Sequence, residues 1–181
     1  GFKLVQAIES KQSKDNQIIN YLDLVALAIA ADVVPLTGEN RVLSFIGLQI
    51  INSNPRPGVH SLLKKNVKKE YTISDLMYYV GPRINAAGRM KHASLALEVL
   101  ICNDINSVEK LALEIEDLNT SRKDIEKDIT SQAIEQVDNS SEKLNSIVVF
   151  DSDWNKGVIG IVASRLVDKY YKPSIVFCES S

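Results

Sequence analysis

The clearest fold signal in the chain lies in residues 146–177, which have the sequence SIVVFDSDWNKGVIGIVASRLVDKYYKPSIVF. The apolar runs at 146–150 and 173–177 have the length and β-branched composition of buried strands, and residues 157–169 between them have helical spacing. Parallel strands need a crossover connection, which is usually a helix. The segment therefore predicts a β-α-β unit and an α/β fold class.

Residues 107–137 follow a helical period. Apolar side chains recur three or four residues apart at Val108, Leu111, Ile115, Leu118, Ile125 and Ile129. About thirty residues at 1.5 Å each would make a rod of roughly 45 Å, ending at the polar break Asp138-Asn139-Ser140-Ser141. One apolar stripe on a charged rod is typical of a connector between lobes, and a coiled-coil dimer is the alternative.

Upstream of the rod the patterns predict only helices. A capping box formed by Asn20 and Asp23 opens a very apolar helix. That helix should stop near Val34, because Pro35 disfavours helical geometry in the residue before it. Further helices are expected at 2–13, 40–51, 59–65, 74–80 and 95–102.

The composition is that of a folded protein. Hydrophobic residues make up 45% of the 181 residues, and no apolar run reaches the roughly 18 residues of a membrane span. Cys102 and Cys178 lack zinc or disulfide spacing, so a reducing compartment, the cytoplasm, is expected. The chain begins with Gly1 and ends directly after an apolar run, so we expect a piece of a longer protein.

The net charge of −2 conceals a basic island. Residues 55–92 carry eight Lys or Arg against two acidic residues. Such an island binds polyanions if the fold gathers it on one face. The alternative is that its four central lysines only form the solvated face of a short helix.

Asp32 follows a run of eight apolar residues. A carboxylate there should lie near or inside the core, where an unpaired charge costs several kcal/mol. The negative end of the helix dipole would add to that cost. A divalent cation such as Mg²⁺ or Mn²⁺ would offset both effects, and a turn in which the Asp bonds its own backbone is the alternative.

Two other segments could contact phosphate. In Gly81-Pro82-Arg83-Ile84-Asn85-Ala86-Ala87-Gly88-Arg89, two arginines could fork onto phosphate oxygens, or the segment could be a tight turn with surface arginines. In 151–165, a strand end leads through Trp154 and Lys156 into Gly157-x-x-Gly160, where backbone N–H groups could hold an anion and a base could stack on the indole. Close helix–sheet packing would explain the same glycines.

These segments together resemble the RecJ family of single-strand-specific exonucleases, within the DHH phosphoesterase superfamily. Residues 23–41 resemble its last metal-binding motif, 81–89 its most distinctive signature, Leu118-Asn119 with Arg122 its interdomain helix, and 154–165 the start of its DHH-associated domain. The resemblance implies the C-terminal part of a DHH catalytic domain over 1–104, an interdomain connector helix over 105–141, and the N-terminal part of the DHH-associated domain over 142–181.

The resemblance implies 5′→3′ hydrolysis of single-stranded DNA to mononucleotides in repair and recombination, with a two-metal Mn²⁺ or Mg²⁺ site. Asp32 would be a metal ligand. The implied nucleic-acid-binding residues are Arg83, Asn85, Arg89, Trp154, Lys156, Gly157, Ser164 and Arg165. The expected partners are single-stranded DNA and DNA-repair proteins but no membrane, and the chain is expected to be a monomer.

The chain departs from the family pattern. The Asp-His-His motif and the other upstream metal ligands are absent from this sequence, and Asn155 stands where the family usually has His. We therefore expect the chain alone to be inactive, with no complete catalytic set. The alternatives are a DHH phosphodiesterase acting on short oligonucleotides or cyclic dinucleotides, and a non-catalytic nucleic-acid-binding scaffold.

Overall fold

A computed structural model describes residues 1–12, 17–140 and 145–179. The chain divides into two compact units. The first contains Gly1–Gly88 and His92–Glu116, and the second contains Arg89–Lys91 and Asp117–Ser181. In the described part of the chain, no helix has both the length and the apolar character that crossing a membrane requires.

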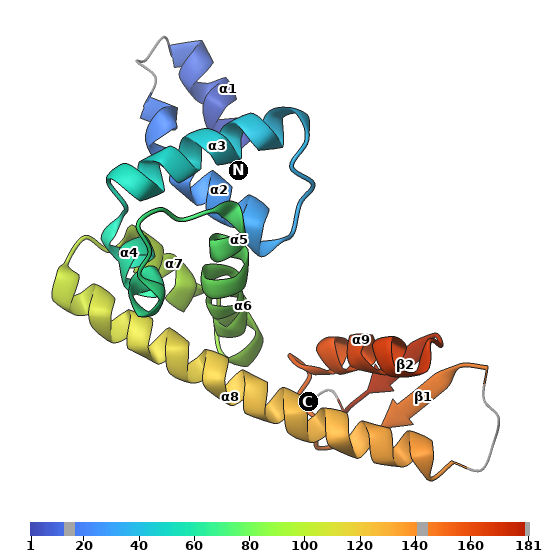
Figure 1. Cartoon of the computed structure of the whole chain (residues 1–181). Coiled ribbons are helices and arrows are strands. Elements are labelled where there is room, and N and C mark those ends of the chain that lie inside the picture. Colours follow the sequence, from blue (N-terminus) through green and yellow to red (C-terminus); the bar gives the residue numbers. More distant parts are fainter. Residues whose placement is uncertain (13–16, 141–144, 180–181) are drawn as a thin grey trace. The chain divides into compact units, whose positions relative to one another are not determined.

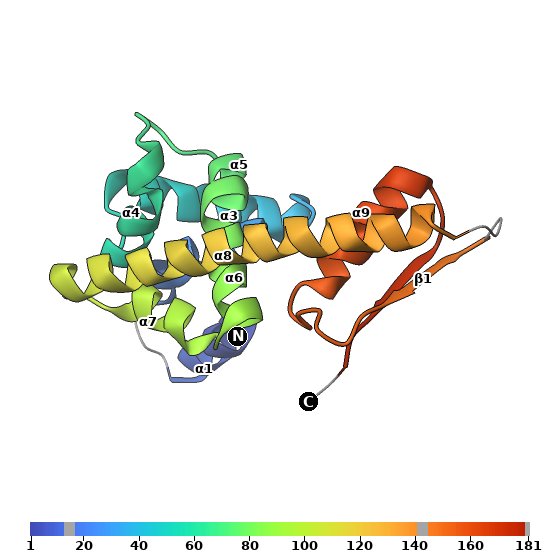
Figure 2. The same cartoon turned by 90° about the horizontal axis from the view of Figure 1, so that it is seen from below.

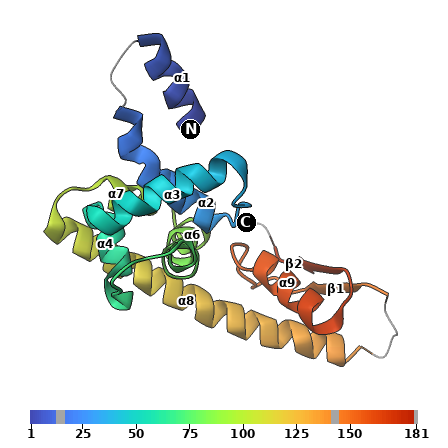
Figure 3. The ribbon, with the colours of Figure 1, turned by 45° about the horizontal axis from the view of Figure 1, so that its top comes forward.

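The first unit is helical (Figure 1). Its elements are α1 (Phe2–Gln12), a 3₁₀ turn (Gln17–Tyr21), α2 (Leu22–Ala31), α3 (Gly38–Ser53), α4 (Pro57–Leu63), a second 3₁₀ turn (Lys64–Asn66), α5 (Ile73–Asp75), a π-helical turn (Leu76–Val80), α6 (Gly81–Met90) and α7 (Ser94–Ile101). The expected helices are confirmed, although Ser13 lies outside the described residues. Helices α2 and α3 cross closely (Figure 3), because Gly47 leaves room for the backbone of Leu22.

The predicted capping box at Asn20 and Asp23 is wrong. Helix α2 begins at Leu22, and its N-cap Tyr21 makes no side-chain capping bond. Asp23 instead turns inward and accepts a hydrogen bond from Arg56 Nε at 2.5 Å. Asp23 therefore forms a long-range ion pair with Arg56 instead of a local capping interaction. The helix also ends at Ala31, before the expected Val34.

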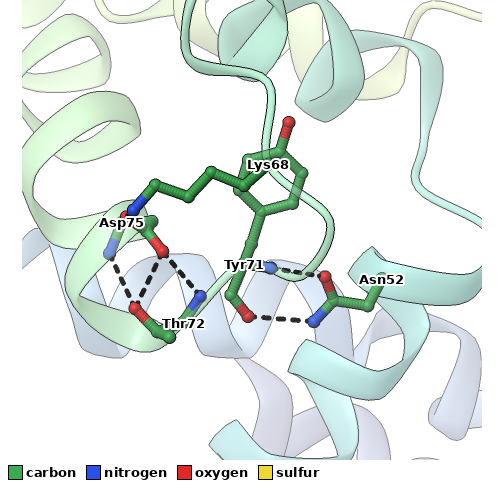
Figure 4. A network of polar contacts seen from close by, with 5 residues as sticks. All are labelled: Asn52, Lys68, Tyr71, Thr72 and Asp75. Carbon is green, nitrogen blue, oxygen red and sulfur yellow. Dashed lines mark hydrogen bonds and ion pairs between the residues drawn. The ribbon is translucent and has the colours of Figure 1, made fainter.

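A capping box does occur in the first unit, at the start of α5 (Figure 4). Thr72 Oγ1 accepts from the Asp75 backbone N–H, and Asp75 Oδ2 accepts from the Thr72 backbone N–H at 2.8 Å. Lys68 Nζ donates to Asp75 Oδ1 at 2.6 Å. Asn52 of α3 exchanges two hydrogen bonds with the backbone of Tyr71, which ties this segment to α3.

The second unit contains the predicted β-α-β unit. Strands β1 (Ile147–Phe150) and β2 (Ser174–Phe177) are parallel, with Ile147 opposite Ser174 and Phe150 opposite Phe177. Helix α9 (Ile159–Tyr170) connects them and lies along the sheet (Figure 1). The predicted crossover is confirmed.

Helix α8 (Ile105–Asp138) contributes to both units. Its 34 residues make a rod of about 51 Å, which confirms the predicted long helix and is visible along its length in Figure 2. In the second unit, Ile129 and Ala133 of α8 belong to the same buried cluster as Val162 and Leu166 of α9. Ser141, in the predicted break, and residues 142–144 lie outside the described part.

Candidate metal and nucleic-acid site

The end of α2 and the start of α6 meet within the first unit. Asn85 Nδ2 donates a hydrogen bond to the Ala31 carbonyl oxygen at 3.4 Å. Gly81 approaches the same residue, and a Cβ at Gly81 would lie only 3.1 Å from Ala31 Cα. The structure therefore brings the segment 81–89 against the residue that immediately precedes Asp32, so two of the predicted site segments are neighbours.

Asp32 is exposed in this structure and lies at the C-cap of α2, so the prediction that it lies in the core is wrong. Its backbone N–H donates to the Ala28 carbonyl oxygen at 3.1 Å. The apolar run buries the body of the helix but not its end. A carboxylate within reach of solvent suits a hard cation as one ligand, and its role as a metal ligand stays a prediction.

Asp32 does not belong to a complete metal site within the described residues. Over 1–12, 17–140 and 145–179, the structure holds no group of three or more His, Cys, Asp or Glu placed to bind one ion. Asp32 fits a metal centre as a single oxygen donor, and the remaining ligands would have to come from elsewhere.

The residue after Asp32 is strained. Val33 has φ 52°, in the left-handed region that β-branched residues rarely adopt. Its N–H donates to the Ala30 carbonyl oxygen at 3.2 Å, and the N–H of Val34 donates to the Ile29 carbonyl oxygen at 3.0 Å, so the turn is held by backbone bonds. Strain of this kind costs on the order of 1–3 kcal/mol and clusters at functional sites.

The buried carboxylate of α2 is Asp23, a residue whose importance the sequence did not reveal. Asp23 is 1% exposed, and its two oxygens accept from Arg56 Nε and from the Leu24 backbone N–H, the latter at 2.8 Å. Arg56 also donates to the Asn20 carbonyl oxygen and lies over the Tyr21 ring at 5.6 Å. A single acid inside an apolar run was the available signal, but it did not identify the partner.

The segment 81–89 is helical, so the interpretation of it as a tight turn is wrong. Pro82 is the second residue of α6, which continues directly from the π-helical turn Leu76–Val80. Arg83 is buried, and it forms an ion pair with Glu116 at 2.5 Å and donates to the Tyr79 carbonyl oxygen. These bonds give Arg83 a clear structural role, and direct contact with nucleic acid stays a prediction.

Arg89, near the end of α6, belongs to the second unit. Its Nη1 donates to the Gly157 carbonyl oxygen at 3.0 Å. A Cβ at Gly157 would collide with the Arg89 carbonyl oxygen, so this position needs glycine for close backbone approach. A Cβ at Gly160 would meet nothing within 4 Å. Packing within the described residues therefore accounts for the first glycine of the Gly-x-x-Gly and leaves the second without a packing reason.

The expectation that a base stacks on Trp154 does not fit this conformation. Trp154 is 4% exposed and belongs to the buried cluster of the second unit. Its Nε1 donates to Gln132 Oε1 of α8 at 2.8 Å. The ring anchors the loop before α9 to α8, because a buried indole needs a partner for its N–H.

The other predicted residues of the second unit are exposed. Lys156 lies in the loop before α9, and Ser164 Oγ donates to the Gly160 carbonyl oxygen at 3.3 Å. Arg165 donates through Nε and Nη2 to Glu126 Oε1 of α8, at 3.1 and 3.0 Å. Their nucleic-acid contacts stay predictions.

Much of the basic island is neutralised inside the first unit. The ion pairs are Arg56–Asp23, Lys64–Glu109, Lys68–Asp75 and Arg83–Glu116. Acidic side chains, most of them far away in sequence, reach the island, so its local excess of charge overstates the positive surface available to a polyanion.

Comparison with known proteins identifies relatives of the chain. A single-stranded-DNA-specific exonuclease RecJ from Haemophilus influenzae is 40% identical over 168 residues, which is 88% of this chain. The chain is similar to RecJ. No model of a protein family matches it. The similarity covers only 29% of the length of that RecJ, so the chain spans less than a third of this relative.

Solved RecJ structures have the same fold. RecJ from Thermus thermophilus in complex with Mg²⁺ superposes with a TM-score of 0.87 and 29% identity, covering 98% of this chain and 28% of that one. The structure of RecJ from the same organism in complex with Mn²⁺ gives a TM-score of 0.87 at 30% identity, with 98% and 26% coverage. The helix-rich α/β fold predicted from the sequence is confirmed, and it corresponds to part of RecJ.

Proposed function

We infer that the chain is part of a metal-dependent exonuclease that hydrolyses single-stranded DNA to mononucleotides in the 5′→3′ direction. Its cellular role would be DNA repair and recombination in the cytoplasm. The similarity to RecJ over 88% of the chain supports this inference. The observation that carries it is the contact of Asn85 and Gly81 with Ala31, next to Asp32.

Asp32 would supply one carboxylate ligand to a site for Mn²⁺ or Mg²⁺, the ions bound in the Thermus RecJ structures. Two such ions activate a water and stabilise the leaving oxygen of the phosphodiester. Asp32 is exposed, which leaves it accessible, and backbone hydrogen bonds hold the strained turn at Val33 directly after it. Cations would also offset the repulsion between the carboxylate and the end of the α2 dipole.

The remaining residues would hold the strand. Asn85 is exposed beside the end of α2 and can donate to a phosphate or a base. In the second unit, Ser164 and Arg165 lie on α9 and Lys156 lies in the loop before it. These polar and cationic groups suit a phosphodiester backbone.

The test is made in the longer protein that this proposal implies. Asp32→Ala should lower the Mn²⁺-dependent release of mononucleotides from 5′-phosphorylated single-stranded DNA by orders of magnitude. Glu98→Gln, a change at an exposed acid of α7, is the matched control and should retain activity. Turnover in the Asp32→Ala protein equal to that of an active wild-type protein would remove Asp32 from the reaction, whereas no turnover in the wild-type protein would favour a scaffold.

A further inference from the structure

The second unit contains a cationic groove between α8 and α9, which we call the α8–α9 groove. It has a volume of about 530 Å³. The residues that matter for its chemistry are Arg122, Lys123, Glu126, Lys127, Thr130 and Arg165. Four of these side chains are cationic and one is anionic, in a chain whose overall net charge is −2. The groove therefore concentrates positive charge on an acidic protein.

Glu126 orients two guanidinium groups in this groove. It is 9% exposed, and its Oε2 accepts from Arg122 Nη1 at 2.7 Å while its Oε1 accepts from Arg165. One carboxylate between two arginines leaves a net positive charge. The pairing limits the rotamers of both arginines, which lowers the entropy cost of presenting them to an anion.

The two lysines of the groove are available for an anion. Lys123 and Lys127 are exposed, and neither side chain has an ion-pair partner within the described ranges 1–12, 17–140 and 145–179. They are four residues apart on α8, so they lie one above the other on the same helix face. Like charges at this spacing destabilise a helix by a few tenths of a kcal/mol, and a bound anion relieves that repulsion.

Two further polar atoms of the groove are buried without partners. Arg122 Nε and Thr130 Oγ1 form no hydrogen bond in the described structure. Buried unsatisfied donors are rare in folded proteins. Both atoms belong to residues that line the groove, although the atoms themselves are covered.

We propose that the α8–α9 groove binds the phosphodiester backbone of single-stranded nucleic acid through Lys123 and Lys127, with Arg165 held by Glu126. This rests on the proposed function, because it assigns the groove to the same strand. Phosphate oxygens match the charge and the guanidinium geometry. The interactions would be independent of sequence and strongly dependent on salt.

The test measures the binding of fluorescent oligo(dT) to the chain by anisotropy over a range of salt concentrations. The double variant Lys123→Gln/Lys127→Gln should make the negative slope of log K against log salt shallower by about 1.4. Each lost contact between a lysine and a phosphate of the single strand reduces the magnitude of the slope by roughly 0.7. Lys172→Gln, at an exposed lysine outside the groove, should leave the slope unchanged.

Three results would overturn the proposal. If the double variant keeps the wild-type slope while the wild-type chain binds oligo(dT), the groove is excluded and the proposed function stands. If the wild-type chain does not bind oligo(dT), the groove proposal fails, and the proposed function is decided separately by the Asp32→Ala assay in the longer protein. If polyglutamate displaces oligo(dT) from the wild-type chain but not from the double variant, the groove is a site for an acidic protein.

Discussion

Replacing Arg56 with Ala tests whether Asp23 is held in the first unit as a buried charge. The variant keeps the bond from the Leu24 N–H to Asp23 but removes the guanidinium from a carboxylate that is 1% exposed. Removing one partner of a buried pair costs about 3–5 kcal/mol. Asp23→Asn should cost less, about 1.5 kcal/mol, because Arg56 is 27% exposed and keeps its bond to the Asn20 carbonyl oxygen.

The double variant Arg56→Ala/Asp23→Asn makes the test decisive. It buries a neutral amide instead of an unpaired anion, so it should be more stable than Arg56→Ala alone. The free energy of unfolding is measured by urea titration with far-UV circular dichroism. Arg41→Ala, at an exposed arginine of α3, is the control and should change stability by no more than about 0.5 kcal/mol. A double variant no more stable than Arg56→Ala would refute the buried-charge argument.

Two further predictions concern pH and backbone packing. Burial raises the pKa of the Asp75 carboxyl, but its hydrogen bonds from Lys68 and Thr72 outweigh that effect and lower the pKa below its ordinary 3.8. The ionised carboxylate therefore stabilises the fold above that pH, and this stability is lost as the pH falls further. Asp75→Asn should flatten the acid limb of a plot of unfolding free energy against pH, and an unchanged limb would contradict this. Gly157→Ala should destabilise the second unit by about 1–3 kcal/mol through overpacking against the Arg89 carbonyl, and the fluorescence of the single tryptophan reports the unfolding. The control Gly160→Ala should leave stability unchanged, because there is open space around its Cβ. Equal losses of stability at both glycines would contradict the packing argument.

The sequence predicted the parts of the fold that depend on local periodicity. The parallel strands and the crossover helix follow from two short apolar runs and the helical spacing between them. The strands are not buried on both faces as predicted, because Val148 and Phe150 are exposed while Ile147 and Val149 are buried. The long helix follows from its apolar stripe. These patterns succeed because each element buries one continuous face, and the period of that face is written in consecutive residues.

The sequence-based predictions failed where the environment of a side chain depends on residues far away in the sequence. Asp23 left its predicted cap because Arg56, 33 positions away, reaches it. Trp154 was expected to be open to a base, but Gln132 is placed by α8 to take its N–H. Neither partner can be identified from spacing along the chain, because both depend on how separate elements pack.

The site was predicted in its parts but not in its environment. The resemblance to RecJ implied that the segment 81–89 and Asp32 belong to one site, and Asn85 does bond to the residue before Asp32. Burial of Asp32 was inferred from the apolar residues that precede it. An apolar run predicts which face of a helix packs against the core. The burial of the residue after the run depends instead on where the helix ends, and α2 ends at Ala31, before Asp32.

The second unit includes Arg89–Lys91, which lie far upstream of the rest of that unit in the sequence. This limits how the chain can be truncated. A recombinant piece that starts after α8 would lack the helix that supplies Ile129 and Ala133, and even one that starts at Asp117 would lack the short strap whose backbone abuts Gly157. Either truncation would expose apolar surface and favour aggregation. Limited proteolysis should accordingly trim the termini before it releases a soluble C-terminal half.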